Sequence, residues 1–327
     1  MSRTPVALTI AGSDSGGGAG IQADLKAFAR CGVHGCSAIT AITAQNTVGV
    51  QAIHHVPPEI VLAQVRAVVR DIGVDAVKVG MLGSTEVTLA VARALDELPA
   101  GTPVVVDPVM VAESGARLLD ADAQGALIAE IVPRASVLTP NLPEARVLAG
   151  GMSSAPGAGA GTHGAGVRAG ITRQAGAEAI DVEREEALEL ARAMLALGSR
   201  AVVLTGGHRA RAVDLFLERP RAGESHDGES QAGRCSEATI VEISGERHPD
   251  GAAHGSGCTH SSVLAAQLAL GDSPLQAARV ARALAGEAVA HGLRDLGAGA
   301  GPVDVLGLAR MRQLRSKPRE RGIIEER

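Results

Sequence analysis

The sequence predicts one α/β domain with a doubly wound, mostly parallel central sheet that carries helices on both faces. Two observations favour this class. Short apolar runs rich in β-branched residues alternate with longer segments of helical periodicity, which is typical of parallel strands joined by crossover helices. The chain of 327 residues is also long enough to bury a substantial core, and because aromatic residues make up only 1% of it, that core must be aliphatic.

Short apolar runs are the expected strands. In chain order they cover residues 6–10, 37–42, 76–79, 104–106, 136–138 and 201–204, with two further runs at 213–217 and 239–243. The segments between the first six have helical periodicity, as where Ile21, Leu25 and Phe28 fall on one face. The expected helices cover residues 21–30, 58–72, 86–95, 123–131, 143–148, 184–197, 258–270 and 274–291.

Two segments interrupt this alternation. Residues 150–170 contain eight glycines and one charged residue, Arg168, so they cannot bury enough apolar surface to offset the entropy of ordering. Residues 219–235 are polar and Gly-rich between two strand-like runs, which favours a β-hairpin with a long loop. We expect a single domain over residues 1–314, flexible insertions near 150–180 and 219–235, and a charged tail at 315–327.

Composition narrows the class of partner. The formal net charge is −5, charges of both signs are spread along the chain, and Trp and Tyr are absent. Because nucleic-acid binding needs a basic stripe or stacking aromatic rings, a small-molecule partner is favoured and nucleic acid is not. The four cysteines lack the pairing of a disulfide scaffold, and no apolar segment is long enough for a signal-peptide core or a membrane span. We expect a cytoplasmic protein with reduced thiols and no membrane association.

The segment HGSGCTHSSVLAA, residues 254–266, is the strongest sign of chemistry, because two glycines and a cysteine stand where a loop turns into an apolar helix. The backbone amides of Ser256, Cys258 and Thr259 are expected to be unpaired there, which favours an anion such as phosphate. The same field is expected to lower the pKa of the Cys258 thiol and allow proton abstraction near neutral pH. An ordinary glycine turn with a small buried cysteine explains this motif alone equally well.

Polar residues follow all six of the first expected strands. Ligands of open α/β sheets bind beyond the carboxyl ends of the strands, so these segments are expected to converge on one site. They are GSDSGGGAG (12–20), TAQNT (43–47), KVGML (78–82), DPVM (107–110), TPNLPE (139–144) and TGGH (205–208).

A dinucleotide-binding loop is the alternative for the first of these segments, since Gly18, Gly20 and Ala23 fit G-x-G-x-x-A. That loop needs an acidic residue at the end of the next strand, and residues 31–58 contain no Asp, Glu, Lys or Arg. The G-x-x-x-x-G-K-[ST] loop is also absent from the chain. If the protein uses ATP, its phosphates would therefore have to be bound by a different structural element.

Seven motifs occur in a specific order: GSDSGGGAGIQADLK, AITAQNT, KVGMLG, DPVM, TPNLPEA, a GGH segment and HGSGCTHS. In this order they resemble the hydroxymethylpyrimidine and phosphomethylpyrimidine kinases of thiamine biosynthesis, within the ribokinase-like superfamily. The resemblance covers nearly the whole chain apart from the two insertions and the tail. It implies ATP- and Mg²⁺-dependent phosphorylation of the pyrimidine's hydroxymethyl group, a second phosphorylation to the diphosphate, and a homodimer.

The resemblance also implies which residues bind the pyrimidine: Asp14, Ala19, Gly20, Thr43, Gln45 and Met81. Gln45 offers an acceptor and a donor side by side, which suits the ring nitrogen and exocyclic amine of an aminopyrimidine. Met81 can pack its polarisable side chain against an aromatic ring. A loop-stabilising amide and a plain core methionine are the alternatives for these two, and Asp14 either orders its own loop or accepts a substrate hydrogen bond.

Nucleotide and metal are expected at a second set of residues: Asp107, Asn141, Glu144, Thr205 and Gly207, with Mg²⁺ on Asp107 and Glu144. Their oxygens suit a Mg²⁺ ion that retains several waters. Asn141 followed by Glu144 also fits a helix capping box, and both interpretations can hold together.

The implied catalytic residues are Gly255, Ser256, Gly257 and Cys258. The amides of this turn would collect charge on the moving phosphoryl group, while Cys258 would take the hydroxyl proton of the substrate. Lys78 and His208 are expected to be structural.

Two departures from the resemblance concern the phosphates of ATP. Relatives usually carry a lysine immediately before GGH, where this chain has Thr205, and a T-K-N-T run where it has DGAA, residues 250–253. Losing two cations should weaken nucleotide binding or the second phosphorylation unless Arg209 or Arg211 compensates. A pyridoxine or pyridoxal kinase, whose site shares the cysteine, and a catalytically weak ligand-binding relative are the alternative functions.

Overall fold

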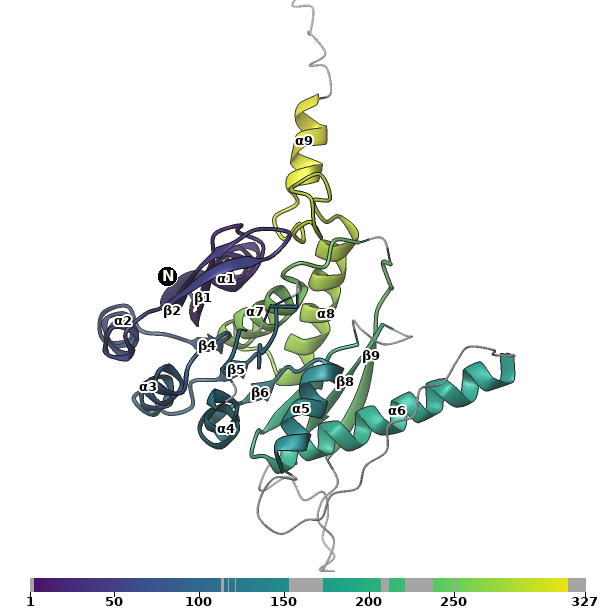
Figure 1. The fold of residues 1–327 in the computed structure, drawn as a ribbon, viewed down its shortest axis with the longest axis horizontal. Helices are drawn as coiled ribbons and strands as arrows, with labels where there is room; N and C mark the ends of the chain where they lie inside the picture. Colours follow the sequence, from purple (N-terminus) through teal and green to yellow (C-terminus); the bar gives the residue numbers. More distant parts are fainter. Residues whose placement is uncertain are drawn as a thin grey trace, which may run out of the picture.

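The computed structural model describes residues 3–112, 115–116, 118–120, 122–152, 173–206, 212–220, 238–249 and 251–316. Within these residues the strands form one nine-stranded sheet in the order β3-β2-β1-β4-β5-β6-β7-β8-β9 (Figure 1). The strands are β1 (Val6–Asp14), β2 (His34–Gln45), β3 (Val50–His55), β4 (Ala76–Val79), β5 (Val104–Val106), β6 (Val137–Leu138), β7 (Ala201–Leu204), β8 (Val213–Glu218) and β9 (Thr239–Ser244).

The sheet is parallel through its centre and antiparallel at both edges. Strands β2, β1, β4, β5, β6 and β7 pair in parallel, whereas β3 pairs with β2, and β8 with β7 and β9, in the antiparallel sense. The chain leaves β1 first toward β2 on one side and later reaches β4 on the other. This reversal makes the carboxyl end of β1 a topological switch point, where open α/β sheets bind their ligands.

Helices cover both faces of the sheet, as Figure 1 shows. They are α1 (Gly20–Arg30), α2 (Pro58–Asp71), α3 (Thr85–Asp96), α4 (Ala123–Ala126), a π-helical turn (Leu127–Ile131), a 3₁₀ turn (Val132–Arg134), α5 (Leu142–Met152), α6 (Arg173–Ala196), α7 (Ser256–Ala269), α8 (Pro274–Ala290) and α9 (Leu308–Ser316). Helices α2, α3, α5 and α6 pack in one apolar core, and α1, α7 and α8 in another.

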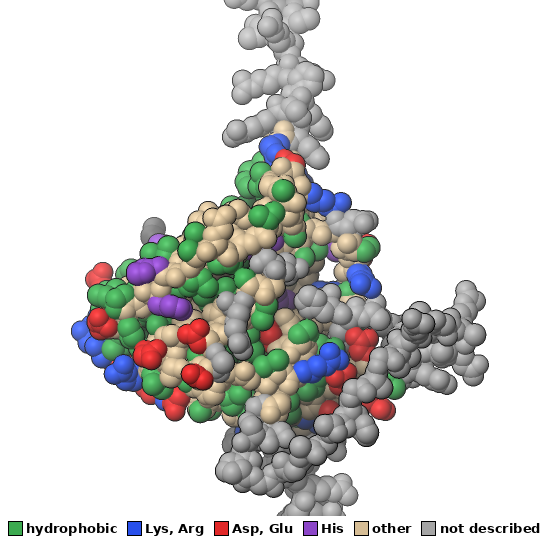
Figure 2. Space-filling view, viewed as in Figure 1, with side chains coloured by type: hydrophobic (Ala, Val, Ile, Leu, Met, Phe, Trp, Pro, Cys, Tyr) green, Lys and Arg blue, Asp and Glu red, His purple; other side chains and the backbone are tan. Residues whose placement is uncertain are grey.

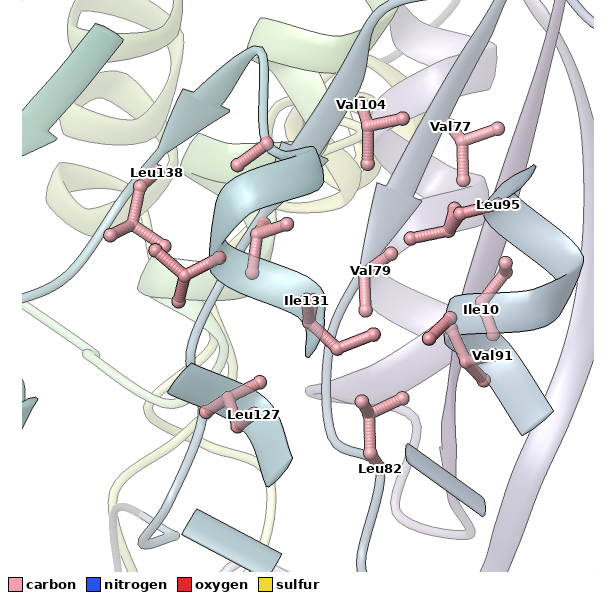
Figure 3. Close-up of a cluster of buried hydrophobic side chains, with 14 of the residues drawn as sticks. Ile10, Val77, Val79, Leu82, Val91, Leu95, Val104, Leu127, Ile131 and Leu138 are labelled. Atoms are coloured by element: carbon pink, nitrogen blue, oxygen red, sulfur yellow. The ribbon is translucent and has the colours of Figure 1, made fainter. Parts of the chain in front are cut away.

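Alternation along the strands divides the apolar residues between the two cores. In β5, Val104 and Val106 lie in the first core and Val105 lies in the second. Figure 3 shows part of the first core, in which Val79 of β4 lies beside Ile131 of the π-helical turn. Both faces of the central strands are therefore buried by aliphatic side chains, as the composition requires.

The predicted mostly parallel sheet with helices on both faces is confirmed. Each predicted strand and helix is present, with ends that differ by a few residues in most cases, and the β8–β9 pair is the predicted hairpin. Two elements were not predicted, β3 and α9. Helix α6 begins at Arg173, inside the predicted insertion near 150–180, while residues 153–172 and most of the 219–235 segment lie outside the described residues.

The outer surface shows charges of both signs. Figure 2 displays Asp and Glu side chains together with Lys and Arg on the same face, beside patches of apolar side chains. Among the helices that the structure describes, none has an apolar stretch long enough to cross a lipid bilayer.

Candidate active site

A cavity of about 420 Å³ lies at the carboxyl ends of the central strands. It is lined by the residues that follow β1, β4, β5, β6 and β7, and by the start of α7. All but one of the predicted site residues line it: Asp14, Ala19, Gly20, Thr43, Gln45, Met81, Asp107, Asn141, Glu144, Thr205, Gly255, Ser256, Gly257 and Cys258. Gly207, like His208, Arg209 and Arg211, lies outside the described residues.

The segment from the end of β1 to the start of α1, residues 12–20, is termed the substrate loop. Asp14 organises it by accepting three backbone hydrogen bonds, from Gly16 at 2.7 Å, Gly18 at 3.0 Å and Ala19 at 2.8 Å. Burial alone would raise the pKa of Asp14, but these donors and His254 outweigh it and hold the pKa below its usual value. Asp14 is therefore an ionised residue that orders its own loop, which is one of the two roles expected for it.

Gln45, Thr43 and Met81 form the wall next to the substrate loop. The Thr43 hydroxyl lies 2.9 Å from the carbonyl oxygen of Ser13 and 3.1 Å from Gln45 Oε1, which fixes the orientation of the amide. No hydrogen bond from the described residues involves Gln45 Nε2, so this donor remains for a ligand. Met81 is buried against Ala41 and Leu118, so it is at once core and cavity wall.

The turn at residues 254–258, termed the phosphate loop, starts α7. Gly255 is its N-cap at φ 83°, a conformation that glycine adopts without strain. The expectation that Ser256 and Thr259 leave free amides is wrong: the Ser256 N–H donates to Ala253 O at 3.0 Å, and the Thr259 N–H to Gly255 O at 2.9 Å. A glycine in this conformation folds the turn back on itself and consumes those donors. Within the described chain, the amides of Gly257 and Cys258 make no backbone hydrogen bond outside the helix.

The expected lowering of the Cys258 pKa is also wrong. Burial raises the pKa of the thiol to about 12, and the charges of Asp107 and Asp24 add to the increase. The Lys78 ammonium and the Gly20 backbone act in the opposite direction but do not cancel it. The helix terminus alone does not activate this thiol, because desolvation is the larger effect.

Asp107 and Glu144 both line the cavity, close enough together that the charge of Asp107 acts on the Glu144 carboxyl. Asp107 Oδ2 accepts a hydrogen bond from the Ser261 hydroxyl at 2.9 Å. Glu144 and Asn141 form a reciprocal capping box, in which the Asn141 N–H donates to Glu144 Oε2 at 2.9 Å and the Glu144 N–H donates to Asn141 Oδ1 at 2.8 Å. Burial raises the pKa of Glu144 to about 8, and the charge of Asp107 adds to the shift.

The two carboxylates suit a divalent cation. Among the described residues, each has one oxygen held by protein and one without a hydrogen bond, and their mutual repulsion is the kind that a cation relieves. The described part of the chain brings no group of three or more His, Cys, Asp or Glu side chains together for a metal. A Mg²⁺ ion on Asp107 and Glu144 would complete its coordination with water and phosphate oxygens, as Mg²⁺ prefers.

Glu144→Gln should stabilise the metal-free protein at alkaline pH. The pKa of Glu144 rises from 4.5 to about 8 on folding, so the native state loses stability as pH increases through that window and the carboxyl ionises. Gln cannot ionise and keeps an acceptor for the Asn141 amide. Thermal unfolding from pH 5 to 9 without Mg²⁺ should show the two proteins alike at pH 5 and the variant more stable at pH 9. Glu86→Gln is the control, since the pKa of this exposed carboxyl is lowered by its own backbone amide and by Ser84. If the Tm of wild type and the Tm of Glu144→Gln change in parallel with pH, the prediction is contradicted.

A buried charge network lies directly beneath the phosphate loop. Lys78 and Asp24 are both fully buried, and Lys78 Nζ lies 3.0 Å from Asp24 Oδ1 and 3.6 Å from Asp107 Oδ2. Asp24 also accepts hydrogen bonds from Thr9 at 2.6 Å and Ser262 at 2.7 Å. Lys78 therefore joins α1 to Asp107, and it also lines the cavity.

A second cluster lies beside Thr205, at the end of β7. Asp214 Oδ1 accepts a hydrogen bond from the Gly206 N–H at 2.8 Å and lies 4.0 Å from Arg282 Nε. His260 Nε2 lies 3.2 Å from the other carboxylate oxygen, Oδ2. Burial would raise the pKa of Asp214, but the surrounding donors outweigh it and lower the pKa. Arg282 and His260 both line the cavity, and the positive charge of Arg282 lies on its wall near the Gly206–Asp214 contact.

Four functional candidates were not predicted from the sequence: Asp24, Asp214, His254 and Arg282. Asp24 and Asp214 stand at buried positions within the largely apolar stretches ADLKAF and VDLFLE, and a charge at such a position is the one local signal that marks them. Arg282 carries no such signal, because arginine on a helix is ordinarily exposed.

Solved structures share this fold. A pyridoxal kinase from Staphylococcus aureus in complex with pyridoxal is 28% identical with a TM-score of 0.71 and covers 95% of this chain and 96% of its own. A phosphomethylpyrimidine kinase from Clostridium difficile 630 is 33% identical with a TM-score of 0.61 and covers 85% of this chain and 96% of its own. Fold and site together define a ribokinase-like small-molecule kinase.

The sequence comparisons narrow this class to one family. The family model described as phosphomethylpyrimidine kinase matches residues 14–159 and 174–304. Hydroxymethylpyrimidine/phosphomethylpyrimidine kinases from Rhizobium meliloti (strain 1021) and Haemophilus influenzae (strain ATCC 51907 / DSM 11121 / KW20 / Rd) are 42% and 37% identical; the first aligns over 92% of this chain and 96% of the relative, the second over 95% and 100%. The chain belongs to the phosphomethylpyrimidine kinase family.

Proposed function

We propose that this protein transfers the γ-phosphoryl group of ATP to the hydroxymethyl group of 4-amino-5-hydroxymethyl-2-methylpyrimidine, and then phosphorylates the monophosphate to the diphosphate. One observation carries the proposal: a single cavity is lined by the Gln45 amide, by the two carboxylates Asp107 and Glu144, and by the Cys258 thiol at a helix start. These are the elements needed to hold a polar heterocycle, a metal–nucleotide complex and an acceptor hydroxyl together. Family membership supports the same reaction.

The pyrimidine is assigned to the end of the cavity between Gln45 and Met81. Gln45 Oε1 is engaged by Thr43, and its Nε2 group is left to donate to a ring nitrogen. Met81 supplies an apolar surface for the ring face. Gly20 and Cys258 are brought together there, because the Gly20 backbone contacts the thiol, so the hydroxymethyl group would lie beside Cys258.

The phosphoryl group is assigned to the amides of Gly257 and Cys258, which would meet the charge that develops on it. The acceptor oxygen forms a bond to the γ-phosphorus, the bond from phosphorus to the ADP oxygen breaks, and the hydroxyl proton passes to Cys258. Mg²⁺ held by Asp107 and Glu144 would shield the phosphate charges and cancel the field of Asp107 that raises the Cys258 pKa. Cys258 is in this way a base that requires the assembled site, not an activated thiol of the ligand-free protein.

Turnover on three acceptors tests the proposal. The purified protein is incubated with ATP, Mg²⁺ and either the hydroxymethylpyrimidine, its monophosphate or pyridoxal, and ADP release and ³¹P NMR identify the products. The expected result is phosphate transfer to both pyrimidines with a higher kcat/KM than for pyridoxal. A preference for pyridoxal would replace the proposal with a pyridoxal kinase, and ATP turnover on none of the three would favour a ligand-binding protein.

Thr205→Lys should lower the KM for ATP about tenfold, because one charge-assisted contact to phosphate contributes about 1.5–3 kcal/mol. Thr205 lines the cavity and makes one long side-chain hydrogen bond, 3.5 Å to Pro140 O, so the substitution removes little. Steady-state kinetics on both phosphorylation steps measure the effect. Arg282→Met is the companion variant, since Arg282 lines the cavity and is linked to the Gly206 amide through Asp214. An unchanged KM in Thr205→Lys together with a raised KM in Arg282→Met would show that the chain already has its cation, on α8.

A further inference from the structure

The substrate loop and the phosphate loop are joined by one buried side-chain hydrogen bond. His254 Nε2 lies 3.0 Å from Asp14 Oδ2, and both side chains are buried, 9% and 2% exposed. These residues are 240 positions apart in the chain, on β1 and immediately before α7. The contact therefore links the part of the cavity assigned to the pyrimidine with the part assigned to the moving phosphoryl group.

The two loops also fit together at the level of the backbone. A Cβ atom at Gly18 would lie 2.2 Å from His254 Cδ2, and a Cβ atom at Gly255 would lie 1.8 Å from Gly18 O. No side chain fits at either position: the Gly18 backbone packs against the His254 imidazole, and the Gly255 backbone packs against the Gly18 carbonyl. The separation of the loops is then set by the Asp14–His254 hydrogen bond and by these two close contacts.

Each partner is fixed from its own side as well. Asp14 Oδ2 accepts the amides of Gly18 and Ala19 in addition to His254, and Oδ1 accepts the amide of Gly16, so four contacts within the protein hold the carboxylate in place. His254 O accepts a hydrogen bond from the Val303 N–H at 3.1 Å. A carboxylate held by its own loop thus meets an imidazole whose backbone is anchored to Val303.

We propose that His254 and Asp14 form a latch that sets the position of the substrate loop relative to the phosphate loop, and that His254 is a positioning residue for phosphoryl transfer. The inference rests on the proposed function, since it concerns the geometry of the same reaction. Loss of the latch removes none of the groups assigned to the substrate or the phosphoryl group, but it allows the two loops that carry them to move apart. Transfer between two bound molecules is sensitive to shifts of about 1 Å, so the effect falls on kcat more than on binding of either ligand alone.

Two variants that replace the His254 ring with an amide test the latch, and they differ in whether the amide reaches Asp14. The Nε2 atom of glutamine reaches the place of the histidine Nε2 and can donate to Asp14, whereas the asparagine side chain is one methylene shorter and does not reach. We expect His254→Asn to lower kcat about 10- to 100-fold and His254→Gln to restore most of it. Calorimetric titration with Mg²⁺–ADP alone and with the hydroxymethylpyrimidine alone should give affinities within about threefold of wild type for both variants. His291→Ala, at the exposed end of α8, is the control histidine variant.

The outcomes separate the latch from the proposed function. A wild-type protein that phosphorylates no pyrimidine overturns the proposed function, whatever the variants do. A wild-type protein that is active, with His254→Asn equally active, overturns the latch. If His254→Gln is as slow as His254→Asn, the ring itself and not its hydrogen bond is required, which also overturns it. Thermal unfolding of each variant shows whether a lost kcat comes from lost folding, and in that case Asp14→Asn, which keeps one acceptor oxygen for the loop amides, provides the second measurement.

Discussion

Cys258→Ala should lower kcat by about 100-fold or more, because loss of a general base typically costs 10²- to 10⁴-fold. The Gly257 and Cys258 backbone amides remain in the variant, since Gly255 and not the thiol shapes the turn that presents them. Affinity for Mg²⁺–ADP should therefore stay close to that of wild type. Steady-state kinetics with the hydroxymethylpyrimidine and calorimetric titration with Mg²⁺–ADP measure the two quantities.

Cys36→Ala is the matched control, because Cys36 is a buried thiol in β2 that does not line the cavity. Both alanine variants remove one sulfur atom, but only Cys258→Ala removes it from the site. Near-normal turnover in Cys258→Ala would show that the thiol is a packing residue. Cys258→Ser adds a further comparison, since its hydroxyl is a weaker acid than the thiol and should be slow for the same reason as alanine.

The pH profile separates a base from a packing residue. The pKa of Cys258 lies at about 12 in the ligand-free protein, so the thiolate fraction increases with pH throughout the neutral range. Wild-type kcat should increase with pH, and Cys258→Ala should lose the part of that increase that belongs to the thiol. Both proteins contain the Glu144 carboxyl, whose pKa burial also raises in the ligand-free state, so its contribution is common to the two profiles and their difference isolates Cys258.

The fold was predictable because its central strands are aliphatic runs whose local sequence preference agrees with the structure they adopt. β4, β5 and β7 begin and end where the sequence predicts them. β3, residues 50–55, was not predicted because most of its side chains are exposed and no apolar period marks it; it forms by pairing with β2. The π-helical turn after α4 likewise has no local signal, since it is recognised by its backbone hydrogen bonds alone.

The candidate site was predictable where its residues occupy turns and strand ends. Glycine loops and polar residues at the carboxyl ends of strands share one edge of a parallel sheet, so their convergence follows from topology. The pKa of Cys258 was not predictable, because the helix terminus is visible in the sequence whereas the burial and the nearby carboxylates that oppose it are set by packing. The same holds for Asp24, whose partner Lys78 is 54 residues away.

Lys78→Met should lower the free energy of unfolding by about 3–5 kcal/mol, because it leaves a buried carboxylate without its counter-ion. Lys78 and Asp24 have no exposed surface, and Asp107 also loses the ammonium group 3.6 Å from its Oδ2 atom. Chemical denaturation measures the change. Arg66→Met is the control, since the Arg66–Glu97 pair is exposed on both sides and such pairs contribute about 0–1 kcal/mol. Equal effects of the two substitutions would show that the buried pair is no stronger than a surface pair.

The double variant Asp24→Leu/Lys78→Met distinguishes stability from function. Replacing both partners removes the lone buried charge, so much of the lost stability should return, although the hydroxyls of Thr9 and Ser262 lose their acceptor. Activity should not return with it. The Lys78 ammonium lowers the pKa of the Cys258 thiol and offsets the charge of Asp107, and a methionine does neither. A stable double variant with wild-type kcat would show that the Asp24–Lys78 pair contributes only to folding stability. A stable double variant with a low kcat would show that Lys78 acts on the reaction through Cys258 and Asp107.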